Sequence, residues 1–250
     1  MFSWCAPGKS LSIVAHRGAS AVAPENTLSA FRRALAEGAD AIELDVRLTA
    51  DNELVVIHDA SLRRTANSKG LVAHSTLAEI RLLDAGRWFD PRFAGERIPT
   101  LVEVFEIVPP TIGVNIELKP EHRGRRGALL VERCAQLIVR CKREASVLVT
   151  SFHHPLVALS KKRHPGIPAG ILLHPLRQRA LSPVRIATAI GADYIVFGGK
   201  TLSKRLTQKA HDQGIRVAEY TVNTEHRLRR ASRYGVDAII TNCPGMMLNL

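Results

Sequence analysis

A glycine followed two positions later by an aspartate recurs along this sequence, each time directly before an apolar run. The clear copies are Gly38-Ala39-Asp40-Ala41-Ile42, Gly191-Ala192-Asp193-Tyr194-Ile195 and Gly235-Val236-Asp237-Ala238-Ile239, and Gly214-Ile215-Arg216-Val217 is a weaker copy. Glycine often ends helices because it adopts the left-handed conformation without a steric penalty from a Cβ atom. Each copy therefore predicts a helix before the glycine and a strand after it, which indicates repeated β/α units.

The predicted strands have the composition of parallel strands covered on both faces. Their apolar runs are continuous, as in Tyr194-Ile195-Val196-Phe197. Eight candidates stand near residues 11–15, 41–46, 113–118, 146–151, 168–173, 192–197, 215–221 and 237–241. Helical periodicity fills most of the intervals, over 26–37, 101–108, 127–143, 155–163, 183–190, 203–213 and 224–234. Eight alternations in 250 residues predict a (β/α)8 TIM-type barrel, and a doubly wound open sheet is the alternative.

One insertion, residues 47–98, separates the second strand from its helix. It is much longer than the usual β/α loop of about 2 to 6 residues. Its run Leu54-Val55-Val56-Ile57-His58 predicts a hairpin that returns His58 to the barrel mouth. Trp88, Phe89, Pro91 and Phe93 indicate a small apolar cap over that mouth. We expect a single domain over residues 1–250 that carries this insertion.

The composition is that of a globular protein. Apolar residues make up 46% of the chain, which is ample for a core. No stretch approaches the roughly 18 apolar residues of a membrane helix, and the first fifteen residues lack a signal-peptide pattern. The four cysteines form no C-x-x-C pair and are interpreted as reduced thiols, so we expect a cytoplasmic protein. The net charge of +12 favours anionic partners without selecting one.

Charged residues cluster at the ends of the first three predicted strands. His16-Arg17 ends the first strand. Glu43 and Asp45 are two positions apart, as are Glu117 and Lys119, so each pair points to one side of its strand. If these strands are neighbours in the barrel, all of these side chains meet at one mouth.

The three carboxylates predict a metal site, because Glu43, Asp45 and Glu117 would repel one another without a cation. Oxygen ligands favour Mg²⁺ or Ca²⁺ over zinc. With a dication, Arg17 and Lys119, the site would carry a charge of about −3 + 2 + 2 = +1, which a phosphodiester monoanion balances. The pattern therefore predicts a phosphate-binding site in which Arg17 and Lys119 contact the phosphate.

His16 and His58 are the candidate catalytic residues. The unperturbed pKa of histidine lies near neutrality, so the two imidazoles could act as general base and general acid. Together with the metal site, they predict metal-assisted cleavage of a phosphodiester. Which histidine is the acid, and whether water or a substrate hydroxyl attacks, stay open at this point.

The ordered motifs resemble those of the glycerophosphodiester phosphodiesterase family. They are His16-Arg17-Gly18, Pro24-Glu25-Asn26-Thr27, Glu43-Leu44-Asp45-Val46, His58-Asp59, Gly95-Glu96-Arg97-Ile98-Pro99-Thr100-Leu101 and Asn115-Ile116-Glu117-Leu118-Lys119. The resemblance implies a TIM-type barrel with a small insertion and the same metal, acid/base and phosphate-binding residues. It also implies cleavage of glycerophosphodiesters, such as glycerophosphocholine, to sn-glycerol 3-phosphate and an alcohol.

Three segments depart from the family pattern. Tyr220 stands where tryptophan is common, Thr241-Asn242-Cys243-Pro244 where T-D-x-P is usual, and Leu62-Arg63-Arg64-Thr65 where L-D-R-T is usual. None of these departures falls on the seven proposed catalytic positions, but we expect them to alter the shape and charge of the substrate pocket. Tyr220 is expected to bind substrate by stacking on glycerol or on an alcohol headgroup.

Several residues have more than one interpretation. Asn26 is expected first of all to cap a helix, and Asn115 to orient a ligand or to bond a neighbouring strand. His153-His154 is interpreted as a solvated loop in preference to a substrate contact.

The function also has alternatives. Activity as a lysophospholipase D or related phospholipase would use the same chemistry on a lipid. A non-catalytic basic barrel that binds nucleic acid is disfavoured, because the basic runs lack interleaved aromatic residues, although they could make loose contact with anionic membrane surfaces.

Overall fold

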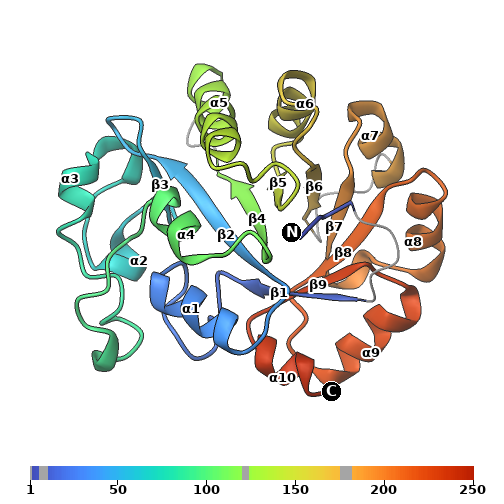
Figure 1. Ribbon diagram of the computed structural model, residues 1–250, viewed down its shortest axis with the longest axis horizontal. Helices are drawn as coiled ribbons and strands as arrows, with labels where there is room; N and C mark the ends of the chain where they lie inside the picture. Colours follow the sequence, from blue (N-terminus) through green and yellow to red (C-terminus); the bar gives the residue numbers. More distant parts are fainter. Residues whose placement is uncertain (1, 6–10, 120–123, 175–181) are drawn as a thin grey trace.

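The described residues of the computed structural model, 2–5, 11–119, 124–174 and 182–250, form a closed parallel barrel inside a ring of helices (Figure 1). Its strands are β1 (Ser12–His16), β2 (Ala41–Leu48), β4 (Gly113–Leu118), β5 (Val147–Ser151), β6 (Ala169–Leu173), β7 (Tyr194–Gly198), β8 (Arg216–Tyr220) and β9 (Ala238–Thr241). They pair in the order β1-β9-β8-β7-β6-β5-β4-β2, and β1 also pairs with β2, which closes the ring. The (β/α)8 prediction is confirmed, and the open-sheet alternative is wrong.

The outer helices occupy the predicted intervals between the strands. They are α1 (Leu28–Ala36), α4 (Leu101–Ile107), α5 (Arg125–Arg140), α6 (His154–Arg163), α7 (Pro183–Ile190), α8 (Lys204–His211) and α9 (Glu225–Tyr234). A short helix that was not predicted, α10 (Pro244–Leu248), follows β9. None of the helices in the described ranges is long and apolar enough to cross a membrane.

The recurring glycine and aspartate have separate structural roles. Gly191 and Gly235 end α7 and α9 in the left-handed conformation, with φ of 66° and 73°. The aspartate of each copy accepts a hydrogen bond from a backbone N–H at the start of an adjacent strand. The pairs are Asp40 Oδ2 with Ile13 N, Asp193 Oδ2 with Ala169 N and Asp237 Oδ2 with Val217 N, at 2.8–2.9 Å. The motif therefore ends helices and also ties neighbouring strands together at the base of the barrel.

Apolar side chains fill the lower part of the barrel interior. Trp4 packs against inward-facing residues such as Val14, Leu148 and Tyr194. The Trp4 indole donates to Ser146 O at 2.9 Å, and the Tyr194 hydroxyl donates to Trp4 O at 2.9 Å. The segment around Trp4 thus closes the base, so the open end is the mouth at the carboxyl ends of the strands.

The insertion forms a small unit with its own apolar cluster beside β2 and α4 (Figure 1). It contains β3 (Leu54–Val56), α2 (Arg63–Ala66), η1 (Val72–His74), α3 (Leu77–Ile80) and η2 (Pro91–Phe93). β3 pairs antiparallel with β2, as the hairpin prediction requires. A hydrogen bond of 2.9 Å from Ile57 N to Asp45 O continues this pairing and brings His58 to the mouth.

Candidate active site

The polar residues at the carboxyl ends of β1, β2 and β4 converge on one cavity of about 340 Å³. In the strand register His16 lies opposite Glu43, and Asp45 lies opposite Glu117. Glu43, Asp45 and Glu117 each offer an oxygen within 4.8 Å of the others. The cavity is lined by His16, Arg17, Glu43, His58, Asn115, Glu117, Lys119, Phe152, Leu172, His174, Tyr220 and Ile240. The structure therefore brings the seven predicted catalytic residues together, since Asp45, which is not among the lining residues, contacts Arg17 and Lys119.

Two cations hold the three buried carboxylates in place. Lys119 Nζ lies 3.2 Å from Asp45 Oδ1 and 2.5 Å from Glu117 Oε1, and Arg17 Nε lies 3.3 Å from Asp45 Oδ2. The backbone N–H of Arg17 donates to Glu43 Oε2 at 3.0 Å. With two cationic side chains among three carboxylates, this buried cluster has an excess of acidic groups.

The protonation of the carboxylates follows from this arrangement. Burial, with the nearby Asp45 and Glu117, raises the pKa of Glu43 well above its usual range, and burial raises the pKa of Glu117 to about 7. Burial opposes the charge of Asp45 as well, but Lys119 and Arg17 keep the pKa of that carboxyl below its usual range. Full ionisation of all three carboxylates at neutral pH thus requires additional positive charge.

The donor set fits a hard divalent cation. Asp45 Oδ1 and Glu117 Oε1 are buried oxygens that both lie against a single cation, the Lys119 ammonium. Both are carboxylate oxygens, the ligand type that Mg²⁺ and Ca²⁺ prefer. Glu43, Asp45 and Glu117 could therefore hold such an ion.

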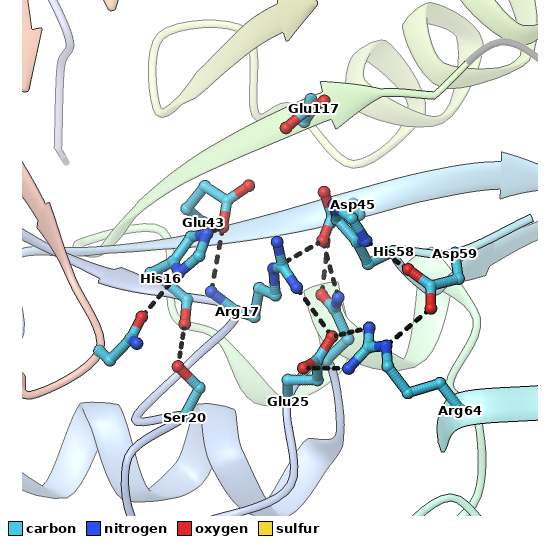
Figure 2. A network of polar contacts seen from close by, with 12 residues as sticks. His16, Arg17, Ser20, Glu25, Glu43, Asp45, His58, Asp59, Arg64 and Glu117 are labelled. Carbon is cyan, nitrogen blue, oxygen red and sulfur yellow. Dashed lines mark hydrogen bonds and ion pairs between the residues drawn. The ribbon is translucent and has the colours of Figure 1, made fainter. Parts of the chain in front are cut away.

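The two histidines have different hydrogen-bond partners. His16 Nδ1 lies 2.6 Å from Asn242 Oδ1, and His58 Nδ1 lies 2.6 Å from Asp59 Oδ1 (Figure 2). An ionised carboxylate only accepts hydrogen bonds, so His58 carries its proton on Nδ1 in the neutral form. Burial and the charge of Arg17 lower the pKa of His16 to about 4, and burial also lowers the pKa of His58.

One departure from the family pattern does touch a proposed catalytic residue. The departures leave all seven positions with the residue of the family motif, but Asn242 bonds directly to His16. The two residues are 226 positions apart, and they meet because β9 pairs with β1. Arg63, in contrast, is exposed on α2 and is not among the residues lining the cavity.

Asn26 is not the helix cap that we expected first. Thr27 caps α1, because its side chain accepts from Ala30 N. Asn26 has a positive φ of 59°, and its Nδ2 donates to Asp45 Oδ2 at 2.8 Å. It thus supports a candidate metal ligand. The sequence feature that could have indicated this role is its position in the Pro24-Glu25-Asn26-Thr27 motif.

An apolar and aromatic wall completes the cavity. Tyr220 donates its hydroxyl to Leu173 O at 2.9 Å and lies 6.1 Å, centroid to centroid, from the Phe152 ring. The Lys119 ammonium lies 5.7 Å from the centre of that ring. We did not predict Phe152, which directly follows β5. The cavity therefore has a charged side and an apolar side.

The ambiguous residues near the mouth now have defined contacts. Asn115 lines the cavity and accepts from Thr150 Oγ1 at 2.9 Å, so it also bonds the neighbouring strand. His153 and His154 are not among the lining residues, and a His154 ring nitrogen lies 3.1 Å from Leu172 O. His174, for which we made no prediction, does line the cavity.

Comparisons with known proteins identify close relatives across the chain. Residues 16–246 match the model of the glycerophosphoryl diester phosphodiesterase family. A glycerophosphodiester phosphodiesterase of Caldanaerobacter subterraneus subsp. tengcongensis is 38% identical over 239 residues, which are 95% of this chain and 96% of the relative. One from Bacillus altitudinis is 37% identical over 93% of this chain and 94% of its own length.

Solved structures share the fold over nearly the whole chain. The Oleispira antarctica phosphodiesterase in complex with the product sn-glycerol-3-phosphate has a TM-score of 0.88 at 27% identity, covering 95% of each chain. The glycerophosphodiester phosphodiesterase of Agrobacterium tumefaciens has a TM-score of 0.82 at 31% identity, covering 96% of this chain and 100% of its own. The similarity in fold thus extends over nearly the whole chain.

Proposed function

The chain belongs to the glycerophosphoryl diester phosphodiesterase family of enzymes, and on that premise we propose that it hydrolyses glycerophosphodiesters to sn-glycerol 3-phosphate and an alcohol. The observation that carries the proposal is the convergence of three carboxylates, two cations and two imidazoles around one cavity. The product bound to the Oleispira antarctica phosphodiesterase supports a small-molecule phosphodiester as the substrate.

We propose that Glu43, Asp45 and Glu117 hold Mg²⁺ or Ca²⁺. When bound, such an ion supplies Lewis-acid polarisation of the phosphate and compensates the negative charge of the cluster. Arg17 and Lys119 contact non-bridging phosphate oxygens, Arg17 through a planar fork and Lys119 as a point charge. Tyr220 and Phe152 offer an apolar surface to the glycerol or to the headgroup.

The hydrogen-bond partners favour one assignment of the two histidines. Asn242 is neutral and adds no charge to hold a proton on His16, so His16 stays neutral and can accept the proton of the attacking hydroxyl group. Asp59 is a carboxylate, and the hydrogen bond from Arg64 lowers its pKa to about 2, so it is ionised and stabilises the imidazolium of His58. We therefore assign His16 as general base and His58 as general acid for the departing oxygen.

The test is an enzyme-coupled assay of sn-glycerol 3-phosphate release from several glycerophosphodiesters. We expect activity to disappear with chelator and to return with Mg²⁺ or Ca²⁺. His16→Ala and Glu43→Ala should lower kcat by at least about 100-fold with the fold intact, as loss of a general base or a metal ligand typically does. Glu106→Gln, an exposed site on α4, is the matched control and should behave as wild type. Full activity in chelator, or in Glu43→Ala, would contradict the proposal.

Lipid phosphodiesters are a second candidate substrate class, which corresponds to lysophospholipase D activity. The supporting observation is the exposure of Phe152 at the cavity and of Trp88 on the insertion, each 39% accessible. Higher activity on micellar lysophosphatidylcholine than on glycerophosphocholine would favour this class. Salt-sensitive nucleic-acid binding without hydrolysis would instead favour a non-catalytic basic barrel.

A further inference from the structure

Five charged or titratable side chains form a continuous chain of contacts along one side of the active site (Figure 2). Arg17 Nη1 donates to Glu25 Oε1 at 2.9 Å, and Arg64 donates to both oxygens of Glu25 at 2.7 and 2.8 Å. Arg64 Nε donates to Asp59 Oδ2 at 2.7 Å, and Asp59 Oδ1 lies 2.6 Å from His58 Nδ1. The proposed phosphate-binding arginine is therefore linked to the proposed general acid.

Arg64 occupies the centre of this chain of contacts. Its guanidinium uses two N–H groups on Glu25 and a third on Asp59, a fixed planar geometry that a lysine ammonium does not reproduce. The Trp88 ring, centred 5.9 Å from the guanidinium carbon, packs near it. The Arg64 side chain is 42% accessible, so single ion pairs here would contribute little, but five connected groups restrict one another.

The chain of contacts also joins two parts of the fold. Glu25 lies in the loop between β1 and α1, whereas Arg64 lies on α2 in the insertion. Asp59 and His58 follow β3 in the same insertion. Arg64 therefore connects the insertion to the barrel beside the cavity, and the position of His58 relative to Arg17 depends on this connection.

We propose that Arg64 is a positioning residue that orients Arg17 and His58 together through Glu25 and Asp59, without contacting the substrate itself. This inference rests on the proposed function for its catalytic consequences. Loss of Arg64 leaves Glu25 with a single arginine and Asp59 without its fixed donor. Arg17 and His58 then sample orientations that no longer face the same phosphate.

The experiment compares Arg64→Met and Arg64→Lys with Arg63→Met. Arg63 is the neighbouring arginine on the same short helix, lies outside the cavity and is the matched control for a lost positive charge. For each protein one measures kcat and KM, the Kd for sn-glycerol 3-phosphate with Mg²⁺ present, and the Tm. We expect Arg64→Met to lower kcat/KM by about 10- to 100-fold, as loss of a supporting hydrogen-bond partner typically does, and to weaken product binding. Arg63→Met should match wild type in all measurements.

Arg64→Lys tests the geometry separately from the charge. It retains the charge but offers a single nitrogen, so we expect it to stay impaired in kcat. A cycle with Asp59→Asn should be partly non-additive, because the effect of Arg64 through Asp59 is already lost in Asp59→Asn while its effect through Glu25 remains. A purely structural role would lower the Tm and the active fraction but leave the Kd of the folded molecules unchanged.

Two outcomes would overturn the inference: wild-type kcat/KM and product Kd in Arg64→Met, or full recovery of both in Arg64→Lys. If instead the wild-type protein releases no sn-glycerol 3-phosphate from any diester tested, the proposed function fails. The product Kd then still tests whether Arg64 positions Arg17.

Discussion

In the absence of a divalent cation, we expect the protein to lose stability as the pH rises from 6.5 to 8. The cause is Glu117, whose buried side chain has a pKa of about 7 in the folded state, against 4.5 for an ordinary glutamate. Because the folded-state pKa is raised, the protonated carboxyl stabilises the fold at low pH, and this contribution is lost as the pH rises through 7. Glu43 shifts in the same direction and adds to the loss.

The magnitude follows from the size of the shift. A difference between 4.5 and about 7 corresponds to roughly 3 kcal/mol in the free energy of unfolding, of which about 1 kcal/mol is lost between pH 6.5 and 8. His16, whose pKa is lowered to about 4, has the opposite sign: its contribution is present above about pH 6.5 and is lost below that value. Between pH 6.5 and 8 this histidine still gains about 0.4 kcal/mol, because half of its unfolded-state population is protonated at pH 6.5. The comparison with Glu43→Gln/Glu117→Gln therefore isolates the carboxylates. For a chain of this size, 1 kcal/mol is about 2–4 °C in Tm.

The assay is thermal and urea unfolding at pH 6.5 and pH 8, in chelator and with excess Mg²⁺ or Ca²⁺. In chelator, we expect the free energy of unfolding to decrease between pH 6.5 and pH 8. Excess cation should remove this decrease, and the double variant Glu43→Gln/Glu117→Gln should not show it. Glu106→Gln should retain the drop. Stability in chelator that stays constant or increases over this range would refute the argument, as would a double variant that still shows the decrease.

Three further changes test other contacts. Asn242→Asp places a carboxylate beside His16 and should raise its pKa by about 1 to 3 units, moving the acidic limb of the kcat/KM profile to higher pH; an unmoved limb would argue against His16 as the base. Asn26→Ala removes the donor to Asp45 and should cost about 1.5–3 kcal/mol of unfolding free energy in chelator, measured by urea unfolding. Trp4→Ala empties the base of the barrel and should cost about 3–5 kcal/mol, while the kcat of folded enzyme stays near wild type.

The sequence predicted the fold well because its signals are local. Each signal depends only on the conformation of a few neighbouring residues, as with the helix-ending glycines Gly191 and Gly235 and the continuous apolar runs. Their repetition along the chain predicted the barrel. Glu43, Asp45 and Glu117 then converge because β2 and β4 are neighbouring parallel strands, whose carboxyl ends lie at the same mouth of the barrel.

The supporting contacts could not be predicted in the same way. Asn242 meets His16 across 226 positions, and Arg64 meets Glu25 across 39, so neither pairing has a local pattern. Asn26 was missed for a different reason, because asparagine before a helix is a good cap by propensity. Its neighbour Thr27 caps the helix, and Asn26, in the loop between β1 and α1, donates to Asp45 of β2 instead.

The aspartates that follow the recurring glycines lie at the opposite end of the barrel from the cavity. Asp40, Asp193 and Asp237 hold neighbouring strands at their starts, whereas Glu43 and Glu117 line the cavity. A library screened only for correctly folded molecules should therefore preserve the first group and tolerate neutral replacements in the second. A library screened for turnover should preserve both groups, so comparing the two would separate the acidic residues needed for assembly from those needed for chemistry.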